Sequence, residues 1–217
     1  EVVGQEAEKN NSKLITPDIN ECKIINQDIK GTNFVYKGNE YYIGMIGSHQ
    51  IINAMTVIEM IEILKQENFN IKQENILNAL KKVSVPARVE HISKNPNIII
   101  DGSHNMAGIT SLIETINKME FGLKIVIFGM VSDKDYVSVT EKINEFADII
   151  ICVDDFADNC INKNELLSLI QKEKYTVTLK NSFSFARKFL KKPSDVIVVC
   201  GSLYLASEIV SRHNYIF

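Results

Sequence analysis

The stretch that decides the fold is Asn97-Ile98-Ile99-Ile100-Asp101-Gly102-Ser103-His104-Asn105. Its first four residues form a short apolar run typical of a buried strand, and a helical pattern follows over residues 106–119. A strand that turns into a helix through Asp-Gly places backbone N–H groups and polar side chains at a helix N-terminus. Because α/β proteins hold anions and nucleotides at such places, the stretch predicts a ligand site beside a parallel sheet.

The same alternation of strand and helix continues to the end of the chain. Strands are expected at residues 88–92, 97–101, 124–128, 149–153, 175–179 and 196–200, with helices at 106–119, 135–146, 164–173, 182–191 and 202–212. Short strands of continuous Ile and Val are typical of a parallel sheet buried on both faces. We therefore predict that residues 85–217 form one α/β domain, Rossmann-like and doubly wound, with a mostly parallel sheet.

Residues 1–84 have a less regular pattern. A helix end is expected at 5–12, strands at 13–15, 23–29, 32–36 and 41–46, and helices at about 49–67 and 73–82. The segment is too short and too irregular for an independent domain, so we predict that it is the C-terminal tail of a larger one. Pro86 ends the helical pattern and places the boundary near residue 84.

The bulk composition excludes several classes of protein. The 217 residues carry a net charge of −3 and are 45% hydrophobic, an ordinary globular balance. This charge gives no reason to expect nucleic acid or an anionic membrane as a partner, and no apolar run approaches the roughly 20 residues of a membrane span. The four cysteines, Cys22, Cys152, Cys160 and Cys200, lack zinc-type spacing and predict reduced thiols in a cytoplasmic protein.

Two polar groups near the start of the predicted α/β domain are candidate ligand residues. Asp101 can accept both hydroxyls of a ribose, while His104 and Asn105 can donate to a phosphate; the alternative is an Asp-Gly turn with a capping side chain. Arg88 lies at the predicted domain junction, where its planar guanidinium suits a phosphate. The alternative for Arg88 is a surface ion pair with Glu90.

Three further positions have weaker signals. Lys134 follows the strand expected at 124–128 and can hold a carboxylate, although a solvated charged loop is the alternative. Ser202 opens the last expected helix, where its hydroxyl and the nearby N–H groups suit a carboxylate or act as an ordinary N-cap. Asn53, on the helix expected at 49–67, can hydrogen-bond an adenine edge, but the local pattern by itself favours a structural role.

Metal and triphosphate motifs are absent from the sequence. Asp154, Asp155 and Asp158 follow the strand expected at 149–153, but aspartates after strands are usually solvated turns, so we predict no metal site in this chain. The sequence contains neither a Gly-x-x-x-x-Gly-Lys-Ser/Thr loop nor a Gly-x-Gly-x-x-Gly motif. We therefore do not expect this chain to cradle a triphosphate unaided.

The order and spacing of five motifs resemble one enzyme family. The motifs are Gly47-Ser48-His49-Gln50-x-x-Asn53-Ala54, Pro86-Ala87-Arg88-x-Glu90, Asp101-Gly-Ser-His-Asn105, Asp133-Lys134-Asp135 and Gly201-Ser-Leu-Tyr-Leu205. Together they resemble folylpolyglutamate synthase / dihydrofolate synthase of the Mur ligase superfamily, over essentially the whole chain. The resemblance implies that residues 1–84 are the C-terminal part of a central ATP-binding domain and residues 85–217 a Mur-ligase-type C-terminal domain, so that the chain is the C-terminal half of such an enzyme.

The resemblance also implies a reaction. ATP and Mg²⁺ convert a carboxylate of dihydropteroate, or the γ-carboxylate of tetrahydrofolate, into an acyl phosphate, and the amino group of L-glutamate then displaces phosphate to form an amide. By motif position, Asn53 contacts adenine, Asp101 the ribose, and Arg88 and His104 the phosphates in a catalytic role, while Lys134 and Ser202 hold glutamate. The implied enzyme is a cytoplasmic monomer whose Mg²⁺ ligands lie mostly in the other half, so this chain by itself is expected to be inactive.

Two departures from the family pattern concern the backbone. The usual Pro-Gly-Arg is Pro86-Ala87-Arg88 here, and alanine is tolerated in place of glycine unless φ is positive. The usual proline after Asp-Gly-Ala-His-Asn is Met106 here, which removes a preferred first helical residue but no ligand.

Two other functions stay open. One is a different Mur-type ligase that adds an amino acid to a cell-wall precursor, against which the Gly201–Leu205 motif argues. The other is a non-catalytic nucleotide- or acid-binding module, which the missing phosphate loop favours. The presence of Arg88, Asp101, His104 and Lys134 together argues against that module, since it has no physical need for all four.

Overall fold

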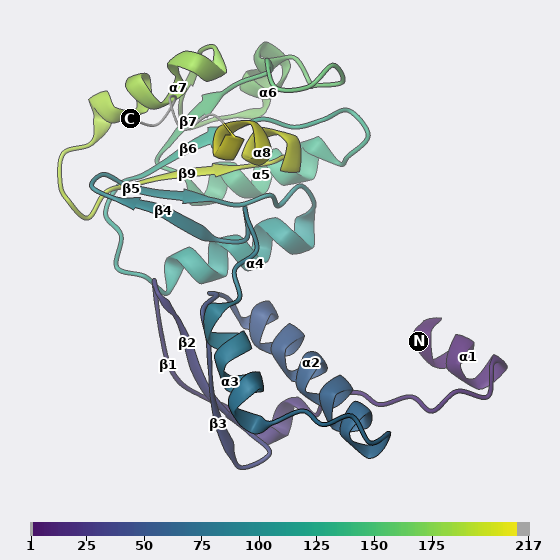
Figure 1. The fold of residues 1–217 in the computed structure, drawn as a ribbon. Coiled ribbons are helices and arrows are strands. Elements are labelled where there is room, and N and C mark those ends of the chain that lie inside the picture. Colours follow the sequence, from purple (N-terminus) through teal and green to yellow (C-terminus); the bar gives the residue numbers. More distant parts are fainter. Residues whose placement is uncertain (1, 212–217) are drawn as a thin grey trace. The chain divides into compact units, whose positions relative to one another are not determined.

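The computed structural model describes residues 2–211 of the chain (Figure 1). Contacts within the chain divide it into two compact units. The first comprises the residues up to Gly44 together with Ser48–Val83, and the second comprises Met45–Gly47 together with the residues from Ser84 onward. Within the described residues, no helix is long and apolar enough to cross a lipid bilayer.

The first unit contains a three-stranded antiparallel sheet in the order β1-β2-β3. Its elements are α1 (Val2–Lys9), the 3-10 turn η1 (Ile19–Glu21), β1 (Cys22–Asp28), β2 (Gly31–Tyr36), β3 (Asn39–Ile43), α2 (Ser48–Gln66) and α3 (Gln73–Lys82). The strand predicted at 13–15 is wrong, because those residues are loop and lie outside this sheet. Without a neighbouring strand, an extended segment has no sheet partners for its backbone groups.

The core of the first unit lies between this sheet and α2. Alternate residues of β2 and β3 are buried, among them Phe34, Tyr36, Tyr41 and Ile43, and the rings of Phe34 and Tyr41 stack with centroids 5.6 Å apart. A period of two puts these side chains on one face of the sheet. The same spacing explains why the sequence predicted strands here.

One buried carboxylate connects the sheet to α2. Glu59 is only 8% exposed, and its Oε1 accepts a hydrogen bond from the Tyr36 hydroxyl at 2.5 Å and lies 2.6 Å from the Lys37 ammonium. The hydrogen bonds from Lys37 and Tyr36 hold the pKa of Glu59 below its ordinary value, although burial acts in the opposite direction. Burial and the neighbouring Glu59 raise the pKa of Tyr36. Glu59 is therefore ionised in the folded unit at neutral pH.

The second unit is a six-stranded sheet in the order β4-β5-β9-β6-β7-β8 (Figure 1). Its strands are β4 (Glu90–Lys94), β5 (Asn97–Ile100), β6 (Lys124–Phe128), β7 (Ile149–Cys152), β8 (Glu173–Thr176) and β9 (Val196–Cys200). All neighbouring pairs are parallel except β4 and β5, which are antiparallel. Only Asn95 and Pro96 separate β4 from β5, too few residues for the crossover that a parallel pair needs. The predicted α/β fold with a mostly parallel sheet is confirmed.

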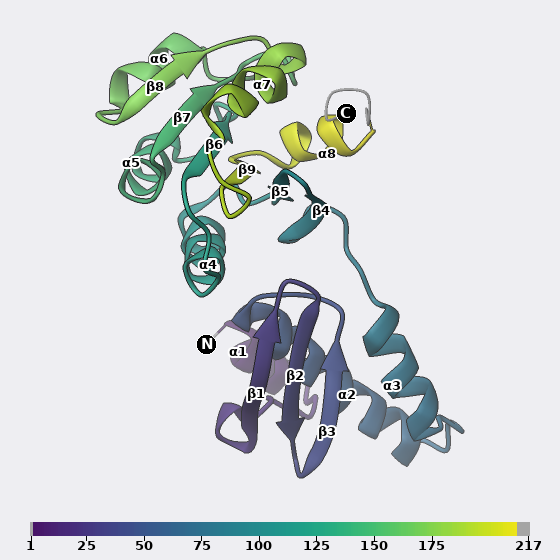
Figure 2. The ribbon, with the colours of Figure 1, turned by 90° about the vertical axis from the view of Figure 1, so that its left-hand side faces the viewer.

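Helices cover both faces of this sheet (Figure 2). One face packs against α4 (Met106–Asn117), α5 (Tyr136–Phe146) and α6 (Lys163–Leu169), and the other against α7 (Leu179–Ala186), the short η2 (Arg187–Phe189) and α8 (Leu203–Ser211). The first face buries Ile99, Val126, Phe128, Ile150, Cys152 and Val198; the second buries Ile98, Ile100, Ile125, Ile127, Ile151 and Val199. Because both faces of the sheet are covered by apolar side chains, the strand sequences are continuous runs of Ile and Val.

The cysteines in these strands behave as small core residues. Cys152 ends β7 and Cys200 ends β9, and both side chains are fully buried. Burial raises the pKa of Cys152 to about 12 and also raises that of Cys200. A thiol with such a pKa stays protonated and unreactive at neutral pH, so both side chains act as small core residues.

Three predicted elements after β7 have wrong boundaries. The helix expected at 164–173 is α6 (Lys163–Leu169) and ends four residues early. The strand expected at 175–179 is β8 (Glu173–Thr176), and the helix expected at 182–191 already begins at Leu179. The carboxylate of Asp155, 24 residues earlier in the chain, accepts a hydrogen bond from the Leu179 N–H at 2.7 Å. This long-range contact satisfies a free donor at the start of α7, and no local sequence pattern announces it.

The strand order determines where loops of the second unit gather. β9, the last strand in the chain, lies between β5 and β6. The helices that follow β5, β6 and β7 lie on one face, whereas the helices that follow β8 and β9 lie on the other. Where helices diverge in this way, the carboxyl ends of parallel strands leave a crevice in which ligands bind.

We expect Glu59→Gln to lower the free energy of unfolding of the first unit by about 2 kcal/mol at pH 7, because it removes a buried, ionised hydrogen-bond acceptor. The folded pKa of Glu59 is lowered, so its contribution is complete above the unfolded pKa of about 4.3 and is lost as the pH falls through the folded pKa. Urea unfolding at several pH values measures the difference. The control is Glu62→Gln, whose partner Lys65 is on the surface; equal effects of both substitutions would contradict the prediction.

Candidate functional site

A cavity of about 300 Å³ opens at the carboxyl edge of the six-stranded sheet. It is lined by His104, Val131, Asp133, Lys134, Asn159, Ser202, Leu203 and Tyr204. These residues come from the segments that follow β5, β6, β7 and β9. The structure therefore brings together His104, Lys134 and Ser202, three of the site residues predicted from widely separated motifs.

His104 belongs to the turn between β5 and α4. Its Nδ1 lies 2.9 Å from the Gly102 carbonyl oxygen. Because a carbonyl oxygen only accepts, Nδ1 carries the hydrogen, and Nε2 remains for a ligand. The next residue, Asn105, accepts a hydrogen bond from the Gly108 N–H at 2.9 Å and so caps α4. This cap starts the helix although Met106, and not a proline, is its first residue.

Lys134 forms an ion pair at the rim of the cavity. Its ammonium lies 2.8 Å from the Asp133 carboxylate, and the side chains are 36% and 59% exposed. The hydrogen bond from Lys134 lowers the pKa of Asp133. Ion pairs this exposed contribute little to stability. A ligand carboxylate can therefore displace Asp133 from Lys134 at small cost.

Ser202 is buried, with 1% of its surface exposed, just before α8. Its Oγ accepts a hydrogen bond from the Tyr204 N–H at 3.1 Å, so the capping alternative describes its contact in this structure. The hydroxyl hydrogen is still available as a donor. The preceding Gly201 has φ of +106°, and a Cβ there would lie 2.5 Å from the Gly129 carbonyl oxygen, so only glycine fits.

Arg88 lies in an unusual turn before β4. The residues on each side of it, Ala87 and Val89, both have positive φ, at +55° and +48°. The arginine itself is exposed, and within residues 2–211 it makes no hydrogen bond or ion pair. The alternative of an ion pair with Glu90 is therefore wrong: Glu90 Oε2 instead accepts a hydrogen bond from the Ala87 N–H at 2.9 Å.

Asp101 directly follows β5 and is buried, at 4% exposure. Its Oδ2 accepts from the Val89 N–H at 2.8 Å, and its Oδ1 accepts from the Ser103 N–H at 2.8 Å and from the Ser103 hydroxyl. Both carboxylate oxygens thus already accept hydrogen bonds from donors of this chain. A ribose hydroxyl would have to share or replace these contacts, and the predicted ribose role stays a prediction.

Asn53 belongs to the first unit and not to this cavity. It is exposed on α2, and its Nδ2 donates to Gln50 Oε1 at 3.2 Å. Both side chains lie on the first turns of the helix. The adenine contact predicted for Asn53 rests on its motif position alone.

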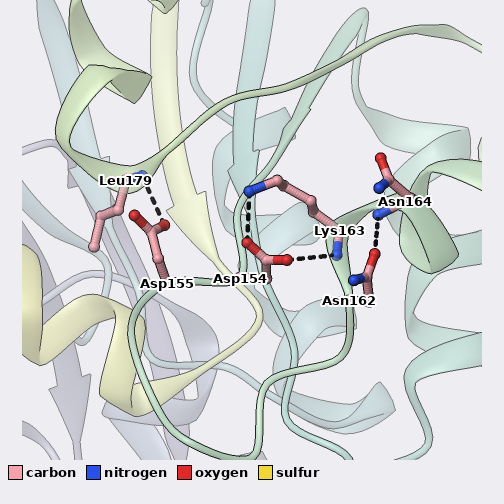
Figure 3. A network of polar contacts seen from close by, with 6 residues as sticks. All are labelled: Asp154, Asp155, Asn162, Lys163, Asn164 and Leu179. Carbon is pink, nitrogen blue, oxygen red and sulfur yellow. Dashed lines mark hydrogen bonds and ion pairs between the residues drawn. The ribbon is translucent and has the colours of Figure 1, made fainter.

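The aspartates after β7 organise a loop (Figure 3). Asp154 accepts hydrogen bonds from the Lys163 ammonium at 2.8 Å and from the Lys163 N–H at 3.2 Å, and Asp155 caps α7. Burial acts to raise the pKa of Asp154, but the bonds from Lys163 bring it below its ordinary value. Among the described residues, no group of three or more His, Cys, Asp or Glu side chains could hold a metal ion.

Sequence reasoning missed Asn159 as a residue of the cavity. Its backbone oxygen accepts a hydrogen bond from the Ser132 N–H at 3.0 Å, and Val131 pairs with Cys160 in an isolated antiparallel bridge. These contacts connect the loop after β7 to the loop after β6. No motif in the sequence marks this connection, because it joins segments about 30 residues apart. Tyr204, at the start of α8, also lines the cavity, and no local pattern distinguishes it from an ordinary exposed helical residue.

Comparison with protein families places residues 87–203 in "Mur ligase, glutamate ligase domain". That match spans more than half of the chain and includes most of the cavity described above. The chain belongs to the Mur ligase family. The predicted resemblance to folylpolyglutamate synthase / dihydrofolate synthase is confirmed by the relatives and solved structures that match the chain.

Curated relatives come from two branches of the family. The dihydrofolate synthase/folylpolyglutamate synthase of Bacillus subtilis is 28% identical over 88% of this chain and 47% of its own length. The folylpolyglutamate synthase of Lacticaseibacillus casei is 28% identical over 82% of this chain and 43% of its own length. A UDP-N-acetylmuramoyl-L-alanyl-D-glutamate–2,6-diaminopimelate ligase of Clostridium perfringens is 30% identical over 54% of this chain. The chain thus spans a little under half the length of the first two of these relatives.

Solved structures show the same fold. A Mycobacterium tuberculosis folylpolyglutamate synthase complexed with ADP and AMPPCP matches with a TM-score of 0.83 at 18% identity, over 99% of this chain and 52% of that one. A bifunctional folylpolyglutamate synthase/dihydrofolate synthase of Yersinia pestis complexed with AMPPNP and Mn ion matches with a TM-score of 0.78 at 20% identity, over 97% and 50%. At these identities the match establishes the fold.

Ala87→Gly is expected to change the free energy of unfolding of the second unit by less than about 0.5 kcal/mol. Left-handed backbone costs alanine about 1–2 kcal/mol, but the greater freedom of glycine in the unfolded chain costs about 0.5–1 kcal/mol and the loss of the buried methyl group about 0.8 kcal/mol, so the terms nearly cancel. Chemical denaturation measures the change. The matched control is Ala107→Gly in α4, where the same substitution is exposed and helical and should destabilise by up to about 1 kcal/mol. A loss of stability for Ala87→Gly as large as that for Ala107→Gly would contradict the idea that Ala87 is strained.

Proposed function

We propose that this chain is part of an ATP-dependent ligase that joins L-glutamate to a folate-type carboxylate. The acceptor is the carboxylate of dihydropteroate, the γ-carboxylate of tetrahydrofolate, or both. The convergence of His104, Lys134 and Ser202 on one cavity at the carboxyl edge of the sheet carries this proposal. The coverage of the chain by folate-branch relatives supports the choice of substrate.

In this proposal the cavity binds glutamate. The Lys134 ammonium attracts a glutamate carboxylate after Asp133 gives way, and the Ser202 hydroxyl and the N-terminus of α8 supply hydrogen-bond donors. The volume of about 300 Å³ accommodates a small amino acid. Glutamate held here has its amino group oriented for attack on the activated carboxylate, which removes much of the entropic cost of bringing two substrates together.

Phosphate chemistry is assigned to Arg88 and His104. ATP transfers its terminal phosphoryl group to the acceptor carboxylate, and the resulting acyl phosphate loses inorganic phosphate when the glutamate amine forms the amide. The exposed Arg88 guanidinium suits a phosphate, and His104 offers Nε2 as a hydrogen-bonding group. Asn53 as the adenine contact and Asp101 as the ribose contact stay predictions from motif position.

Other parts of the reaction are assigned to residues outside this chain. Mg²⁺ would neutralise phosphate charge, and we propose that its ligands belong to the remainder of the native polypeptide, as the resemblance implies.

We also propose that residues 1–84 belong to a larger ATP-binding domain. The exposed apolar side chains of α2, among them Ile52, Val57 and Met60, support this view, since such surfaces usually pack against further protein. The cytoplasmic location and the monomeric state of the enzyme stay predictions.

The cell-wall ligase is the second candidate. Two cell-wall ligase relatives match 54% and 79% of this chain, and the first folate-branch relative matches 88%. Coverage by itself therefore separates the two branches only slightly, and the Gly201-Ser-Leu-Tyr-Leu205 motif is the feature that favours the folate reading. The two candidates differ in the acceptor carboxylate and can be separated by substrate competition.

We expect the native-length polypeptide to incorporate L-glutamate in an ATP-dependent reaction with dihydropteroate, with tetrahydrofolate, or with both. Radiolabelled glutamate in separate reactions measures each activity. Arg88→Ala and His104→Ala should each lower turnover by roughly 100-fold or more, because each removes a group that stabilises developing charge on phosphate. If folded protein incorporates no glutamate with either acceptor in the presence of Mg²⁺, the folate reaction is wrong. The cell-wall ligase or the non-catalytic binding module would then be the better description.

Lys134→Ala should raise the KM for glutamate by about tenfold or more, since it removes a charge-assisted contact to a carboxylate. The matched control is Lys142→Ala on α5, whose ion pair with Glu145 has the same 2.8 Å distance as the pair of Lys134 with Asp133 but lies outside the cavity. An unchanged KM in Lys134→Ala, or an equal change in both variants, would remove Lys134 from the glutamate site.

A further inference from the structure

Among the residues that the structure describes, Asp133 is the only acidic one that lines the cavity at the carboxyl edge of the six-stranded sheet. Its carboxylate lies 2.8 Å from the Lys134 ammonium, and its side chain is 59% exposed. The hydrogen bond from Lys134, with a smaller contribution from the charge of His104, holds the pKa of Asp133 below its ordinary value. The cavity therefore presents a negative charge directly beside a positive one at neutral pH.

The backbone that carries Asp133 is held by contacts with neighbouring segments. The Ser132 N–H donates a hydrogen bond to the Asn159 carbonyl oxygen at 3.0 Å. The Lys134 N–H donates to the Val131 carbonyl oxygen at 3.4 Å. These bonds keep the turn in place, whereas the exposed ion pair of the Asp133 side chain contributes little to stability and exchanges easily.

The other aspartate of the same motif has a structural contact. Asp135 Oδ1 accepts a hydrogen bond from the Ser138 N–H at 3.2 Å and caps α5. Asp133 lies before this helix and pairs with a side chain at the rim of the cavity. A change of partner at Asp133 therefore leaves the start of α5 undisturbed.

Binding of an anion at Lys134 separates Asp133 from its partner. In the proposed function, a glutamate carboxylate replaces the Asp133 carboxylate on the Lys134 ammonium. A ligand that carries only carboxylates would then bring like charge next to the displaced Asp133, and like charges in close contact repel. An α-amino acid carries an ammonium and a carboxylate on the same carbon atom, so each charge of the original pair gains a new partner.

We propose that Asp133 recognises the α-ammonium group of the amino-acid substrate, so that the site selects an α-amino acid over a dicarboxylate of the same length. The inference rests on the proposed function, in which the nitrogen of this group becomes the attacking amine. The turn holds both charges in place before the ligand arrives, which lowers the entropic cost of orienting the nitrogen. Asp133 is thus a substrate-binding residue beside Lys134 and Ser202.

Paired titrations with L-glutamate and glutarate test this role, because glutarate keeps both carboxylates and lacks only the ammonium. Dissociation constants are measured by calorimetry on the native-length polypeptide with Mg²⁺ and a non-hydrolysable ATP analogue. We expect Asp133→Asn to weaken glutamate binding by about tenfold, since it removes a charge-assisted contact. Glutarate binding should be unchanged or tighter by up to about fivefold, since Lys134 loses its competing partner.

Opposite responses of the two ligands separate recognition of the ammonium from two simpler roles. If Asp133 only occupies Lys134, Asp133→Asn would tighten the binding of both ligands. If Asp133 only supports the shape of the cavity, the substitution would weaken both. Either result would overturn the inference, as would an unchanged preference for glutamate in Asp133→Asn or a wild type that binds glutamate no more tightly than glutarate.

Asp133→Glu is the conservative variant, because it keeps the negative charge on a longer side chain. Its affinity for glutamate should stay within about threefold of the wild-type value, well above that of Asp133→Asn. A loss as large as that of Asp133→Asn would contradict recognition by the charge.

Glu145→Gln on α5 is the matched control. The ion pair of Glu145 with Lys142 has the same 2.8 Å distance as the pair of Asp133 with Lys134, and its side chain is 68% exposed outside the cavity. Both dissociation constants should be unchanged in this variant. A loss of glutamate affinity equal to that of Asp133→Asn would mean that the net charge of the unit explains the effect, and the inference would fall.

Binding is measured separately from ligation, so failure of the inference differs from failure of the proposed reaction. A wild type that prefers glutamate to glutarate but transfers it to neither folate acceptor would refute the proposed reaction and leave recognition of the ammonium intact. Glutamate incorporation without the opposite responses of the two ligands would keep the proposed reaction and remove Asp133 from it.

Discussion

The structure depends on one constraint, namely that the parallel sheet of the second unit is buried on both faces. Every residue of β7 and β9 is buried, and no polar side chain can lie within these strands without losing its hydration. Polar chemistry is therefore confined to the strand ends. β5, β9, β6 and β7 end beside one another, and the loops that follow them supply His104, Lys134, Asn159 and Ser202 to one cavity.

The polar residues around this edge divide into groups that hold the loops and groups that remain for a ligand. Asp101, Asn105, Asp154 and Asp155 each accept hydrogen bonds from backbone N–H groups and fix a turn or a helix start. Arg88 lies on the surface without a partner among the described residues, and Lys134 has only an exposed and easily exchanged one. A site for anions is expected to have this division, because rigid support keeps the free cations oriented before the ligand arrives.

The backbone at Ala87 illustrates how a sequence departure is absorbed. Glycine, which is usual at this position of the motif, adopts positive φ at no steric cost, whereas alanine here retains φ of +55°. The turn is kept by burial of Ala87 and Val89 and by hydrogen bonds to Glu90, Gly102 and Asp101. Tertiary contacts therefore compensate for a residue that is locally unfavourable, and the turn before β4 keeps its left-handed backbone at Ala87.

The sequence by itself determined the fold class of the second unit, because continuous Ile and Val runs such as Val196–Cys200 fit only strands that are apolar on both faces. It also singled out Arg88, Asp101, His104, Lys134 and Ser202, since each follows or precedes a recognisable strand. Only the tertiary structure decided that β9 lies between β5 and β6, that Asp155 starts α7, that Asn159 reaches the cavity, and that Asp101 faces the Val89 backbone. These features depend on contacts between residues 12 to about 100 positions apart, and local periodicity carries no information about such pairs.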